Sequence, residues 1–403
     1  MLRSAEVMHL VARRAAEFGV EVSGDVRFRL GTAVERKNRI VGGIHRSIHA
    51  ALRRQSDHIA FLEGEARFVG DHEVEVDSER LSFAKAIIAT GARRLTPPIQ
   101  GIEHIDYLTN DSALHLDQLP ETLVIVGGGY VGIEFAQMYA RFGTRVTLIG
   151  RNRQLAPGSD PELADLLADY LREESIDVRL GATVSAVTEV DGRIEVVIEG
   201  EETAIRTAQL LIAAGRVGNT PSLDPAAAGI DTTGSGFIRV DDQLASSNPA
   251  IWAIGDVKGG WMFTHVATYD GPIAALNAIK GLHKTVDYRV VPRVIFTDPT
   301  LAAVGLTEIE AREQGYEISV GSVPTGGARA MAIGDVRGRV KAVVDRSTRE
   351  ILGFHLLAPH GDDLLHEAVA AMHDRGGIDR ISKSIHAHPT LSEMVKMAAR
   401  AAG

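Results

Sequence analysis

One segment of the chain limits the possible folds more than any other. Thr122–Val126 is an apolar run, and the loop after it carries Gly127, Gly129 and Gly132 in the spacing GxGxxG. Helical spacing follows, and a second apolar run covers Thr144–Ile149. The glycine spacing alone would be a weak signal, but a strand, this loop, a helix and a strand within about 30 residues are typical of a dinucleotide site. The sequence therefore predicts a parallel α/β unit that binds a nucleotide.

Each glycine of the loop has its own physical role in such a unit. Gly127 permits a tight turn, Gly129 lets the backbone approach a pyrophosphate, and Gly132 lets helix and strand pack closely. The phosphates then lie at the positive end of the helix dipole. A glycine-rich turn in an unrelated α/β domain is the alternative.

The end of the second strand indicates which nucleotide is bound. A carboxylate there would bind the ribose hydroxyls of NAD, but position 150 is Gly, and Arg151 and Arg153 follow it. An arginine at this place accommodates a 2′-phosphate. We therefore expect NADP to be preferred over NAD, while a solvated turn is the other explanation of the two arginines.

Composition excludes several classes of function. The sequence has no cysteine, which removes disulfides, thiolate metal sites and thiol nucleophiles from these 403 residues. A formal net charge of −10 argues against a nucleic-acid partner. No run approaches the roughly twenty apolar residues of a membrane span, and Glu6 and Glu17 argue against a transit peptide. We expect a cytoplasmic protein of two to four domains that contacts no membrane.

Four further motifs follow along the chain. They are Ala89-Thr90-Gly91-Ala92, Ala214-Gly215-Arg216-Val217-Gly218-Asn219-Thr220, Ala253-Ile254-Gly255-Asp256-Val257 and His386-Ala387-His388-Pro389-Thr390-Leu391-Ser392-Glu393. With the glycine loop, this ordered series resembles class I of the pyridine nucleotide-disulphide oxidoreductase family, its dihydrolipoamide dehydrogenases and mercuric reductase-like proteins, over essentially the whole chain. The resemblance implies an α/β fold with two Rossmann-like (FAD/NAD(P)-binding) domains, the first incomplete, and an α+β C-terminal dimerisation domain.

The resemblance also divides the chain into segments. Residues 1–119 would be an N-terminally truncated FAD-binding domain, 120–236 the NAD(P)-binding domain, 237–289 a return to the FAD domain, and 290–403 the dimerisation domain. Apolar spacing before about residue 56 predicts two long surface helices. Alternation predicts strands near 59–62, 66–69, 73–76, 85–89, 340–344 and 351–357, and helical spacing returns near 363–372 and 391–402.

Cofactor contacts are implied by the resemblance, residue by residue. Gly91 belongs to the flavin site, Asp256 would accept a hydrogen bond from the flavin's ribityl chain, and Met262 to His265 would lie against the flavin. Gly215 would approach the nicotinamide nucleotide. Glu134 would lie near the flavin's reactive edge, where relatives pair it with a lysine. An Asp-initiated turn is the alternative role for Asp256.

The resemblance implies a proton-transfer pair near the C-terminus. His388 would act as acid and base, and Glu393 would orient its imidazole, an arrangement expected of such a pair. In relatives this pair acts across a dimer interface, so a homodimer is implied. Thr390 with Glu393 also has the spacing of a capping box. His386 and His388 could be read as metal ligands, but no thiolate or spaced carboxylate cluster accompanies them, and we expect no metal.

The sequence departs from the family at its start. Relatives begin with a first GxGxxG and a Cys-x4-Cys helix followed by a lysine, and this sequence contains neither. We therefore expect that about one βαβ unit is missing. The expected function is an FAD-dependent NAD(P)H oxidoreductase that passes hydride from NADPH to FAD and on to an unidentified small-molecule acceptor, without disulphide chemistry in this chain. The alternatives are a non-catalytic relative that binds nucleotide and dimerises, and a thiol-independent NADPH diaphorase.

Overall fold

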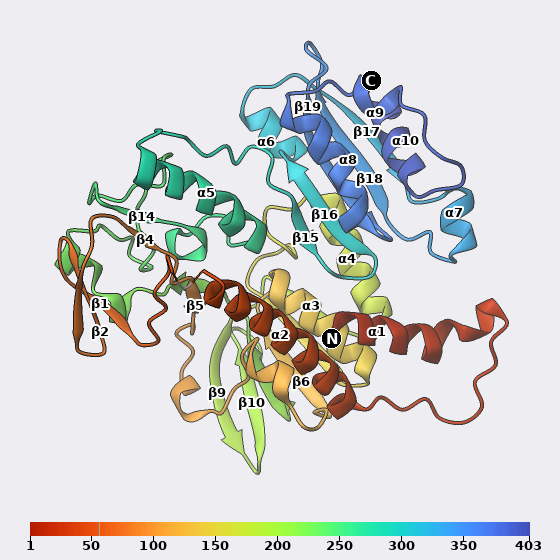
Figure 1. The fold of residues 1–403 in the computed structure, drawn as a ribbon. Coiled ribbons are helices and arrows are strands. Elements are labelled where there is room, and N and C mark those ends of the chain that lie inside the picture. Colours follow the sequence, from red (N-terminus) through yellow and green to blue (C-terminus); the bar gives the residue numbers. More distant parts are fainter. Residues whose placement is uncertain (56) are drawn as a thin grey trace. The chain divides into compact units, whose positions relative to one another are not determined.

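The computed structural model describes residues 1–55 and 57–403 and divides into two compact units (Figure 1). The first unit contains residues 1–37, 96–214 and 289–403, and the second contains residues 38–95 and 215–288. The four predicted segments and their boundaries stay a prediction.

A four-stranded parallel sheet is central to the first unit. Its strands, in the order β12, β6, β7, β8, cover Gln209–Ile212, Thr122–Val126, Arg145–Gly150 and Asp177–Leu180. Helix α3 (Tyr130–Phe142) packs on β6 and β7, and the apolar side chains of Leu123, Ile125, Ile133 and Leu148 are buried between them. Near-continuous apolar strands are typical of parallel sheets covered on both faces. The predicted strand, loop, helix and strand are therefore confirmed.

Further elements of the first unit surround this sheet. Helix α4 spans Pro161–Glu173, and an antiparallel sheet contains β9 (Val184–Val190), β10 (Arg193–Ile198) and β11 (Ile205–Thr207). Short helical turns lie at Ile102–His104 and Ser112–His115.

The C-terminal part of the first unit is an α+β arrangement, as predicted. Five antiparallel strands in the order β15, β16, β19, β18, β17 cover Arg293–Ile295, Thr300–Gly305, Ile351–Ala358, Arg339–Asp345 and Ile318–Pro324. The helices are α6 (Glu308–Glu313), α7 (Gly327–Ala332), α8 (Gly361–His373), α9 (Asp379–Ser382) and α10 (Ser392–Ala402). Every residue of β19 is buried, because helices and strands surround it.

The N-terminal helices differ from the expectation of two long surface helices. Helix α1 covers only Leu2–His9, continues as a π-helical turn at Leu10–Arg14 and ends in a 3₁₀ turn at Ala15–Phe18. It packs on α3, with Ala5 buried in the same core. Helix α2 (Leu30–Arg53) is long, as predicted, and residue 56 lies outside the described residues.

The second unit is built from short strands. Strands β1 (Ala66–Gly70), β2 (Glu73–Val76) and β3 (Glu79–Ser82) form an antiparallel meander, β4 (Ala86–Ile88) pairs in parallel with β14 (Ile251–Ala253), and β5 (Ala92–Arg94) pairs with β13 (Arg216–Gly218). Helix α5 spans Thr264–Lys280, and short helical turns lie at Pro221–Leu223, Pro225–Ala228 and Gly255–Lys258.

The strand predicted near 59–62 is wrong. This segment is irregular, and the side chains of Ile59, Phe61 and Leu62 are exposed. The backbone N–H of Ile59 donates to the carbonyl of Gln55 instead of to a ladder. Alternation over four residues is too short to specify a strand without a neighbouring strand to pair with.

Among the described residues, every helix is either too short or too polar to cross a bilayer.

A buried histidine on β19 makes the stability of the first unit depend on pH. His355 is 0% exposed; its Nε2 donates to the carbonyl of Leu306 at 2.9 Å, and its Nδ1 has no partner among the described residues. Burial lowers the pKa of His355, and this effect outweighs the hydrogen bond to Leu306 and the charge of Asp160, which raise the pKa. The folded protein therefore holds this ring neutral, whereas the unfolded chain takes up the proton below about pH 6.5.

We therefore expect acid to destabilise the wild type more than a His355→Gln variant. Stability from this group is complete above about pH 6.5 and falls by up to ~1.4 kcal/mol per pH unit below it. Urea unfolding between pH 5 and 8 measures the slope, with His373→Gln, at an exposed position on α8, as the control. Equal slopes for wild type and His355→Gln would show that His355 does not carry the effect.

Candidate nucleotide and flavin sites

The glycine loop between β6 and α3 is built by close backbone approach. Gly127 has φ +133°, and a Cβ there would collide with the carbonyl oxygen of Ala213. A Cβ on Gly132 would collide with the carbonyl oxygen of Gly127, at the point where α3 crosses the loop. Side chains are therefore excluded at both positions by the fold itself.

Gly129 differs from these two glycines, because the space beside it is open. It is the N-cap of α3, its side-chain position meets no described atom within 4 Å, and no described side chain caps the helix. The first N–H groups of a helix need acceptors from outside it, and an anion is favoured there by the helix dipole. The loop can thus hold a phosphate group against α3.

Both predicted arginines follow β7 directly. Arg151 and Arg153 are exposed, and neither has an ion-pair partner in the described part of the chain. By contrast, Arg145 at the start of the same strand pairs with Glu121 at 2.5 Å. The positive charges of Arg151 and Arg153 therefore stay available to a ligand.

The second unit holds a separate groove, a cavity of about 420 Å³. Its lining residues are Ala89, Gly91, Arg216, Ile254, Gly255, Asp256, Met262, Thr264 and Ala267. The structure thus brings Gly91 together with Asp256 and Met262, which lie much later in the sequence, while Gly215 directly precedes the lining residue Arg216. His265 is not among the lining residues, and its ring stacks on Phe263 at 5.1 Å between centroids.

Asp256 lies on the short helical turn that follows β14. Its Oδ2 is 3.4 Å from Nη2 of Arg216, a lining residue that the sequence analysis did not single out. The turn is held in place by a buried hydrogen bond, because the backbone N–H of Gly255 donates to the fully buried carboxylate of Asp270 at 3.1 Å. Asp270 in turn pairs with Lys258 at 3.4 Å. In the sequence, the signal that Arg216 lines this groove was its position directly after Gly215.

The histidine and glutamate predicted near the C-terminus lie in contact. Nδ1 of His388 is 3.1 Å from Oε1 of Glu393, and Oε2 of Glu393 accepts from the backbone N–H of Thr390 at 3.1 Å. This N–H and His388 together lower the pKa of Glu393. The hydroxyl of Thr390 donates to the carbonyl of Ala387 instead of capping α10, so only half of the capping box forms. Glu393 therefore makes the contact expected of an orienting carboxylate and one of the two contacts of a capping box, and its catalytic role stays a prediction.

Comparison with protein families identifies the chain. The model described as pyridine nucleotide-disulphide oxidoreductase matches residues 5–271, and the model of the family's dimerisation domain matches residues 291–399. The chain belongs to the pyridine nucleotide-disulphide oxidoreductase family. The fold class predicted from the sequence is confirmed.

Individual relatives agree with this membership. Mercuric reductase from Bacillus cereus is 35% identical over 99% of this chain, which spans 63% of that relative's length. Dihydrolipoyl dehydrogenase 1, mitochondrial, from Arabidopsis thaliana is 31% identical over 100% of this chain and 80% of its own length. The structure of the HOCl-induced flavoprotein disulfide reductase RclA from Escherichia coli superposes with a TM-score of 0.87 at 31% identity, covering 98% of this chain and 89% of that one.

Glu134 has a different partner from the lysine that the family resemblance implies. Its Oε1 accepts a hydrogen bond from the backbone N–H of Phe296 at 3.0 Å. Burial raises the pKa of Glu134, and this one hydrogen bond offsets the rise only in part. The carboxyl group on the second turn of α3 therefore takes up a proton more readily than an exposed glutamate.

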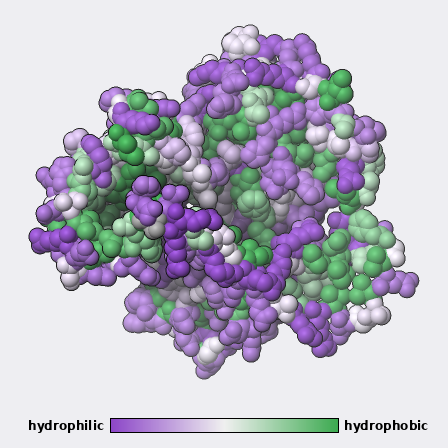
Figure 2. Space-filling model, in the orientation of Figure 1, coloured by the Kyte–Doolittle hydropathy of each residue, from purple (hydrophilic) through white to green (hydrophobic). Residues whose placement is uncertain are grey.

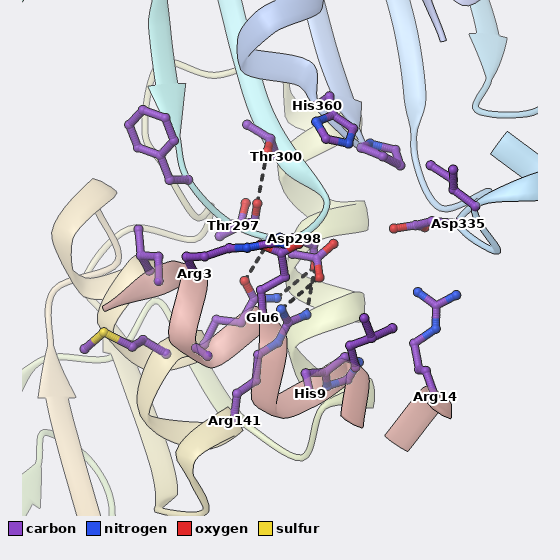
Figure 3. A pocket seen from close by; sticks show the side chains of 18 of the residues that line it. Arg3, Glu6, His9, Arg14, Arg141, Thr297, Asp298, Thr300, Asp335 and His360 are labelled. Carbon is purple, nitrogen blue, oxygen red and sulfur yellow. Dashed lines mark hydrogen bonds and ion pairs between the residues drawn. The ribbon is translucent and has the colours of Figure 1, made fainter. Parts of the chain in front are cut away.

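The first unit also contains a larger cavity of about 680 Å³, which the sequence analysis missed (Figure 3). It lies between α1, α3, the turn at 296–300 and two loops near 332–335 and 359–362, segments that are far apart in the sequence. On its wall, Arg141 donates to Glu174 and Asp298. Burial and the charge of Arg141 lower the pKa of His9, so this ring is neutral at neutral pH. None of the predicted site residues lines this cavity.

Exposed apolar side chains accompany the N-terminal helix. Figure 2 shows apolar patches between polar surfaces, and Val7, Leu10, Val11 and Phe18 are among the exposed apolar residues of the first unit.

Within the described residues, no three His, Asp or Glu side chains gather as metal ligands would.

Proposed function

We propose that this chain is an FAD-dependent NAD(P)H oxidoreductase with an unidentified small-molecule electron acceptor. The observation that carries the proposal is the glycine loop at the N-terminus of α3 in a chain of this family. No described side chain caps the helix there. The bound nicotinamide nucleotide supplies a hydride, and the flavin supplies the redox chemistry that relays it. The protein's own residues bind these groups, orient them and move protons.

Nucleotide binding is assigned to Gly127, Gly129, Gly132 and the two arginines. Backbone N–H groups of the loop and the dipole of α3 would hold the pyrophosphate. The free positive charges of Arg151 and Arg153 support NADPH over NADH, since a 2′-phosphate needs a cation beside it. Gly215 is assigned to the nicotinamide end.

Flavin binding is assigned to the groove of the second unit. Its 420 Å³ lies within the usual range for small-molecule sites, about 300–1,000 Å³, and would hold part of FAD. The carboxylate of Asp256 can accept from a ribityl hydroxyl, while Gly91 leaves open space beside the backbone. Met262 and His265, also in the second unit, would pack against the ring.

Proton transfer is assigned to His388 and Glu393 in a homodimer. Glu393 fixes Nδ1 of the ring, which leaves Nε2 to give or take a proton. The match to the family's dimerisation domain supports the dimer. We place the protein in the cytoplasm, without a nucleic-acid or membrane partner.

The acceptor would receive electrons without a protein thiol from these residues. The sequence contains no cysteine, so no residue of it can exchange with a disulphide. This observation favours a thiol-independent diaphorase as the second candidate function. A non-catalytic relative that binds nucleotide and dimerises is the third.

Dye reduction distinguishes these functions. With added FAD, an NADPH-dependent diaphorase bleaches a soluble redox dye, and turnover requires both NADPH and FAD. A binding protein gives an NADPH dissociation constant by calorimetry but no dye reduction above free FAD. The proposal fails if the protein neither binds NADPH nor reduces the dye.

The arginines after β7 provide a prediction on nucleotide choice. In an Arg151→Gln, Arg153→Gln double variant, we expect the NADPH dissociation constant to rise about tenfold, the equivalent of ~1.4 kcal/mol, while that for NADH stays unchanged. Calorimetric titration with both nucleotides measures this, with Arg145→Gln as the control because that arginine already pairs with Glu121. An equal loss of NADH affinity would contradict a 2′-phosphate contact.

A further inference from the structure

We infer that Glu367 on α8 is a positioning residue for His388, and that it acts through His386. The inference rests on the proton-transfer role proposed for His388. It adds a second histidine and carboxylate pair to the one formed by His388 and Glu393, on the same loop of the dimerisation domain.

Both ring nitrogens of His386 lie beside hydrogen-bond acceptors. Its Nε2 is 2.9 Å from Oε1 of Glu367, and its Nδ1 is 3.2 Å from the carbonyl oxygen of Ser384. The side chain of His386 is only 7% exposed, whereas that of Glu367 is 32% exposed. A buried ring between two acceptors cannot turn without taking an N–H away from its acceptor, which costs about 1–3 kcal/mol. His386 is therefore fixed in one orientation.

The side chain of His388, in contrast to that of His386, is exposed. Its exposed fraction is 71%, and Glu393 is its one carboxylate partner among the described residues. Only Ala387 separates it from His386, so the backbone of His388 can lie no more than about 7 Å from that of His386. The buried histidine thus anchors the backbone from which the exposed histidine projects.

The rest of the loop is tied to neighbouring helices. The ammonium group of Lys396 on α10 donates to the carbonyl of Ser384, and the hydroxyl of Ser384 donates to the carbonyl of Arg380 on α9. On the C-terminal side, Thr390 contacts both Ala387 and Glu393. Between these two ends, the contact of Glu367 with His386 joins α8 to the middle of the loop.

This arrangement matters because proton transfer depends on position. A misplacement of about 1 Å can cost roughly a hundredfold in rate. An exposed imidazole on a loose loop would lose that precision to thermal motion. A buried partner on a separate helix supplies rigidity without touching the reacting atoms.

The test compares two substitutions of Glu367. In Glu367→Ala, we expect amides 384–391 to exchange hydrogen at least tenfold faster, and the carbethoxylation of His388 by diethyl pyrocarbonate to slow severalfold as the ring leaves Glu393. In Glu367→Gln, the carboxamide oxygen still accepts from Nε2, so both readouts should stay within twofold of wild type. Asp363→Ala, an exposed carboxylate one turn earlier on α8, is the matched control.

Two results would overturn the inference. Wild-type exchange and carbethoxylation in Glu367→Ala would show that the contact does not hold the loop. Equal loss in Glu367→Gln and Glu367→Ala would show a general disturbance of α8, since the conservative change would then fail to rescue. Both readouts are independent of turnover, so an inactive wild type would contradict the proposed function and leave this test intact.

Discussion

Replacing Lys341 with methionine should lower the free energy of unfolding by about 3–5 kcal/mol, because it leaves the buried carboxylate of Asp160 without a counter-charge. The ammonium group of Lys341 on β18 lies 2.9 Å from Asp160, 3.2 Å from Glu162 and 2.5 Å from Glu308. The side chain of Lys341 is 7% exposed and that of Asp160 is 1% exposed. Burial alone would lower the pKa of Lys341, but hydrogen bonds to Glu308 and Asp160 outweigh it and raise this pKa.

The loss of stability follows from the elements that Lys341 connects. Asp160 is the N-cap of α4 and accepts from the N–H of Leu163, while Glu308 begins α6. Urea unfolding of wild type and Lys341→Met measures the loss. Arg339→Gln is the control, since Arg339 is on the same strand and also pairs with Glu162 but is partly exposed, and its loss should stay below about 1 kcal/mol. Equal losses in the two variants would contradict a special role for the buried lysine.

Gly129→Ala should weaken NADPH binding about a hundredfold while leaving the fold nearly unchanged. The added methyl group meets no described atom within 4 Å, so the protein accepts it. The backbone at Gly129 has φ −92°, which alanine adopts without strain. In the complex, the methyl group would lie where the pyrophosphate approaches. Loss of one or two hydrogen bonds to a charged group, each worth about 1.5–3 kcal/mol, accounts for the magnitude.

Two glycine variants make this prediction specific. Gly132→Ala should lower the melting temperature as well as the affinity, because its methyl group collides with the carbonyl of Gly127. Gly234→Ala, at a position with open space outside the loop, should change neither. Calorimetry gives the affinity, and a thermal melt gives the stability. Normal NADPH binding by Gly129→Ala would mean that phosphate does not approach α3 at this loop.

Sequence patterns predicted the elements whose burial is decided locally. The apolar run at Thr122–Val126 and the three glycines specify a parallel strand and a close helix crossing, and the structure has both. The C-terminal strands and helices were predicted for the same reason, since their apolar periodicity matches their burial. Short motifs also indicated that Gly91 and Asp256 belong to one site, and both line the same groove.

Other features depend on contacts that no local pattern contains. The alternation at 59–62 predicted a strand, but no described neighbour pairs with it. The cavity beside α1 is formed by segments hundreds of residues apart. Glu367 is 19 residues from His386, and their contact forms only because the fold brings α8 and the loop side by side. Sequence spacing carries no information on such pairs.

We propose that residues of this chain bind NADPH and FAD so that hydride passes between them. The most direct measurement is the visible spectrum of FAD-loaded, gel-filtered protein mixed with NADPH in the absence of oxygen. We predict that the yellow flavin absorbance disappears as NADPH is consumed in equal amount. Protein that emerges without FAD, or whose flavin absorbance is unchanged by NADPH, would contradict the account.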